Sequence, residues 1–109
     1  MDQLIALPGV VAAFAFSDRG ELTEAKRRGE CPLDDRKLDL LSHLCVANLA
    51  VATMQARGWG TLTQSADYYP VEAVTLIGDK WSAMASPTHG VLLDTSQADF
   101  DAAYDALTG

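Results

Sequence analysis

One stretch with helical periodicity, residues 33–57, constrains the fold of this 109-residue chain more than any other segment. Asp34 and Asp35 place negative charge in its first turn, where a helix favours acids. Arg57 and Gly58 follow its last apolar residues and are typical of a helix end. At 1.5 Å per residue such a helix is roughly 37 Å long, so we expect it to cross an entire small sheet.

Apolar residues cover more than one side of this helix. One stripe at helical spacing, with three residues that widen it, has enough apolar surface to pack on a sheet. We therefore expect the sheet-facing side to consist of Leu40, Leu44, Ala47, Val51 and Met54, widened by Leu41, Cys45 and Ala52.

A second apolar group on the same helix has no sheet left to contact. It consists of Val46 and Leu49, flanked by Ser42, Ala50 and Thr53. Each exposed aliphatic side chain forgoes about 1.5–3 kcal/mol relative to burial, and a second copy of the same helix offers a matching surface. These five residues therefore predict a homodimer interface. Two alternatives stay open: the terminal helix or the aromatic connector covers them in a monomer, or a different protein does.

The remaining segments predict an α+β protein. A short helix over 3–7, capped by Asp2, precedes two strands joined by an Asp/Gly turn in which Gly20 takes a positive φ. Three more strands follow the long helix, after a polar connector that begins at Gly58 and has a short strand around 61–63. Ser96 caps a closing helix. The expected strands are 10–17, 21–29, 71–79, 80–86 and 90–96.

We expect one domain, residues 1–109, in the order α-β-β-α-β-β-β-α. The first strand is apolar enough to be buried on both faces, and the second, more polar strand suits a sheet edge. Cutting this order into two domains would leave a sheet face open. The long helix is therefore expected to lie across a central five-stranded antiparallel sheet.

Composition narrows the class of partner. Fifteen acidic residues against eight basic ones give a net charge of −7, which disfavours nucleic acid. The longest apolar run, 7–16, is about half of a membrane span, and the N-terminus lacks the basic residues of a signal peptide. We expect a cytoplasmic protein that does not span a membrane. Lys26, Arg27 and Arg28 form the one basic cluster and are expected on a solvated strand or turn.

No motif predicts catalysis, a cofactor or a metal. His43 lies two residues before Cys45, and residues at this spacing on a helix point in different directions. His89 lies in a Pro-Gly turn without nearby ligands. Cys45 is expected in the core, and Cys31 is expected to be the more exposed thiol. Three aromatic residues of the connector are candidates for a ligand or partner surface: Trp59, Tyr68 and Tyr69.

The segment 7–22 reads LPGVVAAFAFSDRGEL and contains a Pro-Gly turn, a buried strand and an Asp/Gly turn. This pattern resembles the opening of the roadblock family, named for a dynein light chain. The order of elements extends the resemblance over nearly the whole chain, within the broader profilin-like and longin-like class. It implies a non-enzymatic platform that dimerises through the long helix and a neighbouring sheet edge, here the strand 71–78. Bacterial and archaeal members often accompany small Ras-like GTPases.

The leading functional prediction is thus a small homodimeric regulatory scaffold. Two other classes stay open. The first is a ligand-binding sensor of profilin-like architecture, with a pocket between the sheet and the connector around Trp59 and Tyr69. The second is an accessory subunit of a redox or sulfur enzyme that uses Cys31.

Overall fold

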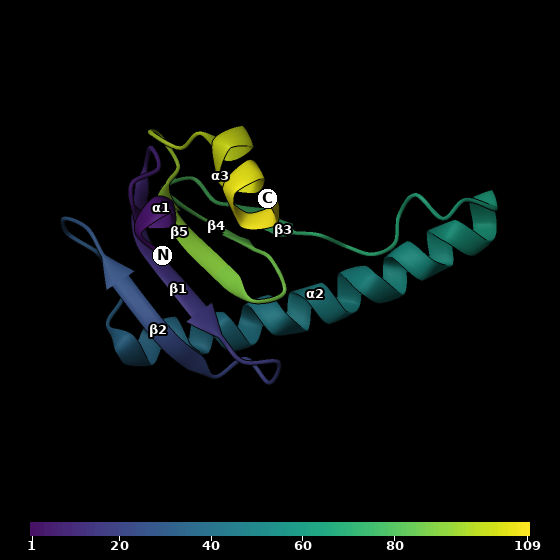
Figure 1. The fold of residues 1–109 in the computed structure, drawn as a ribbon, viewed down its shortest axis with the longest axis horizontal. Coiled ribbons are helices and arrows are strands. Elements are labelled where there is room, and N and C mark those ends of the chain that lie inside the picture. Colours follow the sequence, from purple (N-terminus) through teal and green to yellow (C-terminus); the bar gives the residue numbers. More distant parts are fainter.

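The computed structural model describes residues 1–109 and has the predicted order of elements, α-β-β-α-β-β-β-α (Figure 1). The fold class predicted from the sequence is confirmed. The elements are α1 (Asp2–Ile5), β1 (Val10–Phe16), β2 (Leu22–Arg27), α2 (Asp35–Thr63), β3 (Val74–Ile77), β4 (Trp81–Ala85), β5 (His89–Asp94) and α3 (Phe100–Thr108).

The five strands form one antiparallel sheet in the order β2-β1-β5-β4-β3. β1 lies near the middle and is buried along most of its length, whereas β2 and β3 are the two edges. Both predictions about the first two strands are confirmed. Helices α1 and α3 lie against one face of the sheet, and α2 lies against the other (Figure 1).

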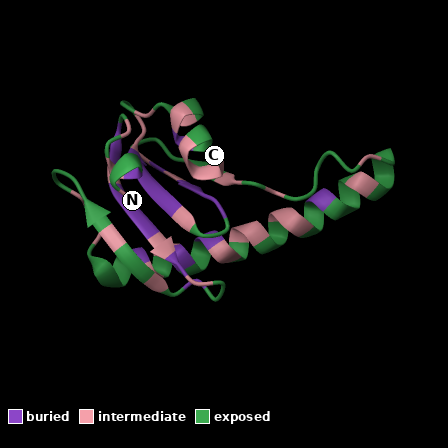
Figure 2. Ribbon diagram, in the orientation of Figure 1, coloured by how far each residue is buried: buried purple, intermediate pink, exposed green.

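Two hydrophobic cores fill the space on the two faces of the sheet (Figure 2). Alternate residues of β1 enter opposite cores, because successive side chains of a strand point to opposite faces. The core beneath α1 and α3 contains Leu4, Val10, Ala13, Met84, Val91, Leu93 and Ala103. The core against α2 contains Ala12, Phe14, Phe16, Leu38, Cys45, Ala85 and Leu92.

The turn between β1 and β2 needs its glycine for two reasons. Gly20 has φ +87°, as predicted, and its N–H donates to the Ser17 carbonyl at 2.9 Å. A Cβ atom at this position would lie 2.8 Å from the His43 Cα atom. The missing side chain therefore lets α2 approach the hairpin.

The end of α2 differs from the prediction. The helix continues through Gly58 to Thr63, so the prediction that the connector begins at Gly58 and has a short strand around 61–63 was wrong. The hydroxyls of Thr61 and Thr63 donate to carbonyls four residues back, at 3.1 and 2.7 Å, which satisfies these groups within the helix. The left-handed residue that follows the helix is Gln64, with φ 57°.

The two predicted caps of the short helices were also wrong. α1 starts at Asp2 without a side-chain cap, and this carboxylate instead pairs with Lys26 on β2. α3 is capped by Asp99, whose carboxylate accepts from the Ala102 N–H at 3.0 Å. The Ser96 hydroxyl is used in the preceding turn, where it donates to Asp94 at 2.7 Å.

Candidate interaction surface on the long helix

α2 is much longer than the sheet is wide. Its 29 residues span about 43 Å at 1.5 Å per residue. Five strands spaced at about 4.8 Å extend only about 19 Å from one edge strand to the other. The helix begins beneath β2, crosses the sheet and projects beyond β3, which gives the molecule its longest dimension of 46 Å (Figure 1). Much of the second half of α2 has no sheet of its own chain to pack against.

The side of α2 that faces the sheet is defined by its buried residues. Leu38 and Ser42 are fully buried and Cys45 is nearly so, all within the first half of the helix, and a fourth buried residue, Ala56, lies on the same side in the second half (Figure 2). Leu41 and Val46 are partly buried and pack against the same core. Burial of the Cys45 thiol raises its pKa to about 11, as expected where the charged thiolate would lose its hydration.

The opposite side of α2 carries an exposed apolar stripe, which we call the outer stripe: Leu40, Leu44, Ala47, Val51 and Met54. Its four large members are 59%, 59%, 54% and 73% exposed, in chain order, and Ala47 is exposed as well. The prediction that this stripe packs on the sheet was wrong. Apolar residues occur on both sides of the helix, so periodicity alone did not determine which side turns inward.

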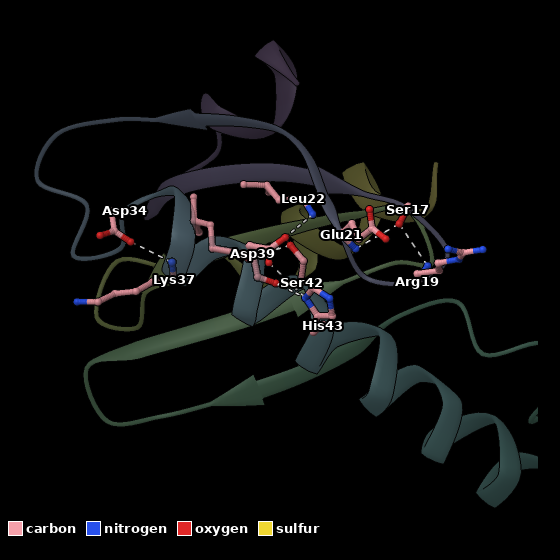
Figure 3. A network of polar contacts seen from close by, with 10 residues as sticks. Ser17, Arg19, Glu21, Leu22, Asp34, Lys37, Asp39, Ser42 and His43 are labelled. Atoms are coloured by element: carbon pink, nitrogen blue, oxygen red, sulfur yellow. Dashed lines mark hydrogen bonds and ion pairs between the residues drawn. The ribbon is translucent and has the colours of Figure 1, made fainter.

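Two tertiary contacts hold the start of α2 against the β1–β2 hairpin, and the one between Asp39 and Leu22 is drawn in Figure 3. The Asp39 carboxylate accepts from the Leu22 N–H at 2.8 Å, which ties the helix to the edge strand β2. Within the helix, the buried Ser42 hydroxyl donates to the Leu38 carbonyl at 2.9 Å, so this polar group is satisfied without a partner on the sheet. Gly20 permits close approach of the hairpin to the helix backbone at His43. The sequence analysis did not single out Asp39. The one feature that could have indicated its role is that it is an acidic residue between Leu38 and Leu40.

The helix start is held by a separate group of polar contacts. Asp34 caps α2 by accepting from the Lys37 N–H at 2.9 Å (Figure 3). The Arg27 guanidinium, on β2, donates to Asp35 at 2.5 Å, and this pairing raises the Arg27 pKa. Lys26 and Arg27 are thus engaged in ion pairs on a solvated edge strand, in agreement with the prediction for this basic cluster.

The five residues predicted to form a homodimer interface lie toward the sheet side of α2 and its flank. Ser42 is fully buried, so it has no surface left for a second copy, whereas Val46 is only partly buried against the core and keeps part of its side chain accessible. Leu49 and Thr53 are partly buried, and the Thr53 hydroxyl donates to the Leu49 carbonyl at 2.8 Å. Ala50 is exposed on the flank. Their role in self-association stays a prediction.

β3 is an unpaired sheet edge next to the projecting helix. It covers Val74–Ile77, a shorter segment than the predicted strand 71–79, and pairs with β4 on one side only. Leu76 and Ile77 are exposed large hydrophobic residues on this edge. An apolar strand with free backbone N–H and C=O groups is a template for pairing with another chain.

The three candidate aromatic residues do not converge on one pocket. Trp59, Tyr68 and Tyr69 are all about half exposed. The Arg57 guanidinium lies 5.1 Å from the centre of the Tyr69 ring and holds the connector against the end of α2. A shallow hollow lined by 67–73 and Tyr104 contains both tyrosines but not Trp59. The structure therefore does not bring Trp59 into one hollow with the two tyrosines, and a ligand or partner role for these three residues stays a prediction.

The remaining candidate groups lie apart from one another. His43 is exposed, with its Nδ1 atom 2.7 Å from the Asp39 carbonyl. Cys31 is half-buried before α2 and its thiol donates to the Leu33 carbonyl at 3.4 Å. No group of three or more His, Cys, Asp or Glu side chains is arranged to hold a metal ion.

By length and composition alone, α2 could cross a membrane. Only 17% of its most apolar stretch is buried within the chain. The core helix of a soluble protein can pass the same test, and here the first half of the helix is built into a core against the sheet.

This three-layer arrangement, with a five-stranded sheet between one long helix and two short ones, is a roadblock-like fold. Solved structures similar to this chain include the Roadblock/LC7 domain from Streptomyces avermitilis, with a TM-score of 0.67, 17% identity and coverage of 98% of this chain and 86% of that one. The gliding protein MglB from Thermus thermophilus has a TM-score of 0.71, 16% identity and coverage of 98% and 82%. MglB from Myxococcus xanthus has a TM-score of 0.63, 16% identity and coverage of 97% and 86%.

The whole chain, residues 1–109, matches the model of one protein family, described as uncharacterized conserved protein (DUF2173). The chain belongs to this family. No curated protein matches it.

Proposed function

We propose that this protein is a small, cytoplasmic, non-enzymatic regulatory module that forms a homodimer and presents α2 to a protein partner. The observation that carries the proposal is the apolar surface of α2 that the chain itself leaves uncovered. Contiguous exposed apolar surface of this kind marks interaction sites in soluble proteins. A scaffold needs such a surface and needs no catalytic group.

The dimer that best fits these features joins two copies along β3. A two-fold axis beside this strand pairs each β3 with its equivalent and continues the sheet across both copies. The part of α2 that projects beyond β3 then lies beneath the sheet of the other copy. The inner side of this projecting part includes Leu49 and Thr53, with Ala50 on the flank, and these residues form the self-association surface together with Val46. Ser42 supports it from within the core.

Structural relatives support self-association as a property of this fold. One similar structure, 16% identical to this chain with a TM-score of 0.71, is described as MglB with a tetrameric arrangement. The partner class that we propose for the dimer is a small Ras-like GTPase, as the resemblance to roadblock proteins implies. The outer stripe is the part of α2 that stays accessible to such a partner after the β3 edges have paired.

Molecular mass in solution tests the dimer. Sedimentation equilibrium of the native chain is expected to give a dimer at low concentration, whereas Ile77→Lys places like charges across the paired edges and gives a monomer. Thr23→Lys introduces the same side chain on β2, the opposite edge, and is expected to leave the dimer intact. A native chain that is monomeric at all concentrations would overturn the proposal.

Partner binding requires a separate measurement. A purified Ras-like GTPase from the same organism is titrated against the native dimer and against Val51→Asp, which places a charge in the outer stripe. Binding by the native dimer and its loss in Val51→Asp support the proposed partner surface. Equal binding by both proteins would show that the partner uses another surface.

A further inference from the structure

All three tyrosines of this chain line one hollow, which lies between α3 and the connector 64–73 that joins α2 to β3. Tyr68 and Tyr69 come from the connector and Tyr104 from α3, and each is 41–50% exposed. The hollow has a volume of about 400 Å³, and its other lining residues are Asp67, Pro70, Val71, Glu72 and Ala73. Half-exposed aromatic rings gathered in one hollow offer their faces to a ligand.

The charged residues that line this hollow are both acidic. No lysine, arginine or histidine lines it, and neither Asp67 nor Glu72 belongs to an ion pair of the structure. A third carboxylate lies close by on α3. The hydrogen bond to Glu72 raises the pKa of Tyr104, and the negative charge of Asp105 acts on it in the same direction. The hollow is therefore electronegative as well as aromatic.

Two contacts hold the tyrosines in place. The Tyr104 hydroxyl donates to the Glu72 carboxylate at 2.6 Å, which joins α3 to the connector. The Arg57 guanidinium lies 5.1 Å from the centre of the Tyr69 ring and forms a cation–π contact with it. Arg57 does not line the hollow, so this cation approaches Tyr69 from outside and leaves the hollow itself without a positive charge.

We propose that this hollow binds a small organic cation that carries a quaternary ammonium group and no acidic group. Such a group is attracted to the faces of aromatic rings, and it has no N–H donors that need acceptors. The three tyrosines supply the rings, and Asp67 and Glu72 supply the opposite charge. The volume lies within the range of about 300–1,000 Å³ that is typical of small-molecule sites.

Other ligand classes fit the hollow less well. A carboxylate or phosphate group would lie near Asp67 and Glu72 without a basic residue to neutralise it. A primary ammonium group has three N–H donors to satisfy, and Glu72 already accepts a hydrogen bond from Tyr104. The composition of the hollow therefore favours a methylated ammonium over an anion, a zwitterion or a simple amine.

All eight lining residues belong to one chain, so the site does not depend on the proposed homodimer or on its partner. A failure of this inference would leave the proposed function unchanged. Conversely, a monomeric protein would still contain the hollow.

Nuclear magnetic resonance titration of the native chain with choline tests the site. At constant ionic strength, choline is expected to shift the amide signals of 67–69, 71–73 and Tyr104 in a saturable way. The side-chain N–H signal of Trp59, which does not line the hollow, should stay in place. The proposal is wrong if choline produces no saturable shift up to about 100 mM, a concentration that would fill a millimolar site. It is equally wrong if the shifts centre on Trp59.

Three further ligands distinguish the charge and the methyl groups. The neutral isostere 3,3-dimethylbutan-1-ol has carbon in place of the choline nitrogen and should bind at least about tenfold more weakly. Glycine betaine adds a carboxylate to the trimethylammonium group, and putrescine carries primary amines. Both are expected to bind more weakly than choline. Equal binding of the neutral isostere, or tighter binding of either other ligand, would overturn the proposed ligand class.

Variants of Tyr68 test the contribution of an aromatic ring. Tyr68→Leu removes the ring and should weaken choline binding about tenfold, whereas Tyr68→Phe keeps the ring and should bind nearly as well as the native chain. Circular dichroism checks that both variants are folded. Equal affinities of two folded variants would contradict binding through the ring face.

A matched pair of charge variants tests the carboxylates without removing a ring. Asp67→Asn removes one negative charge from the hollow and should weaken choline binding several-fold. Asp18→Asn changes the net charge of the chain equally, but it lies in the β1–β2 turn and does not line the hollow, so choline binding should stay the same. If both variants lose affinity equally, choline responds only to the overall charge of the protein and the site is not the one proposed.

Discussion

The carboxylate of Asp39 accepts a hydrogen bond from the backbone N–H of Leu22 at 2.8 Å, and this bond joins the second turn of α2 to the edge strand β2. Asp39 follows the buried Leu38, and the bond holds the helix to β2 with its Leu38 side toward the sheet. The outer stripe is exposed as a consequence. The polar contact and the core residues Leu38 and Cys45 thus favour the same orientation of the helix.

Loss of this contact should destabilise the protein. In Asp39→Ala the Leu22 N–H loses its charged acceptor, and we expect the free energy of unfolding to fall by about 1–2 kcal/mol. Urea denaturation followed by circular dichroism measures the change. Asp35→Ala is the control: its ion pair with Arg27 is mostly exposed and should contribute at most about 1 kcal/mol. Equal losses in both variants would contradict a special role for Asp39.

The glycine in the β1–β2 turn should be intolerant of a side chain. Gly20→Ala introduces a Cβ atom 2.8 Å from the His43 Cα at a positive φ, and we expect it to cost about 1–3 kcal/mol. Gly58→Ala is the matched control, since its Cβ has no neighbour within 4 Å and alanine favours helix by about 1 kcal/mol. Thermal unfolding of both variants should therefore shift in opposite directions. A neutral Gly20→Ala would show that the hairpin can move away from α2.

The order of elements was predictable because local signals agree with the fold. The continuous apolar run of β1 could only be a central strand, and the polar β2 could only be an edge. The end of α2 was not predictable in the same way. Gly58 is an ordinary stop signal, but the helix continues to Thr63, where the left-handed Gln64 ends it; the hydroxyls of Thr61 and Thr63 are satisfied within the helix.

The candidate surface was only half predictable. Sequence periodicity showed that α2 has more apolar surface than one sheet can cover, and the structure agrees. Periodicity could not distinguish the inner side of the helix from the outer side, because leucines such as Leu38 and Leu40 occur on both. The choice depends on tertiary contacts made by Asp39 and Gly20, which no local pattern encodes.

The buried thiol of Cys45 should change the stability at alkaline pH. Its folded-state pKa is about 11, against an ordinary value of 9.0, so the unfolded chain loses this proton first as pH rises. The contribution of the protonated Cys45 thiol to the free energy of unfolding is fully present below pH 9 and is lost between pH 9 and 11. The total loss is about 2–3 kcal/mol for two pKa units. Urea denaturation at a series of pH values should show this decline. The decline should be smaller in Cys45→Ala, which lacks the thiol, and an identical slope would contradict it.

The same burial predicts selective alkylation. With iodoacetamide at pH 8, the folded protein should acquire one adduct, on Cys31, and a second on Cys45 only after denaturation in urea. Mass spectrometry of the intact protein and of its peptides measures both. Rapid labelling of Cys45 in the folded protein would indicate that α2 separates easily from the sheet.

Two leucines two positions apart on α2 test which side of the helix faces inward. Leu38 is 0% exposed and Leu40 is 59% exposed, so their truncation should have very different effects. Leu38→Ala removes buried contacts with the sheet and should lower the free energy of unfolding by about 2–5 kcal/mol. Leu40→Ala, at an exposed position, should change it by no more than about 0.5 kcal/mol. Chemical denaturation of both variants decides the matter. If Leu40→Ala proved the more destabilising of the two, α2 would be rotated by about half a turn from the orientation described here, and the outer stripe would belong to the core.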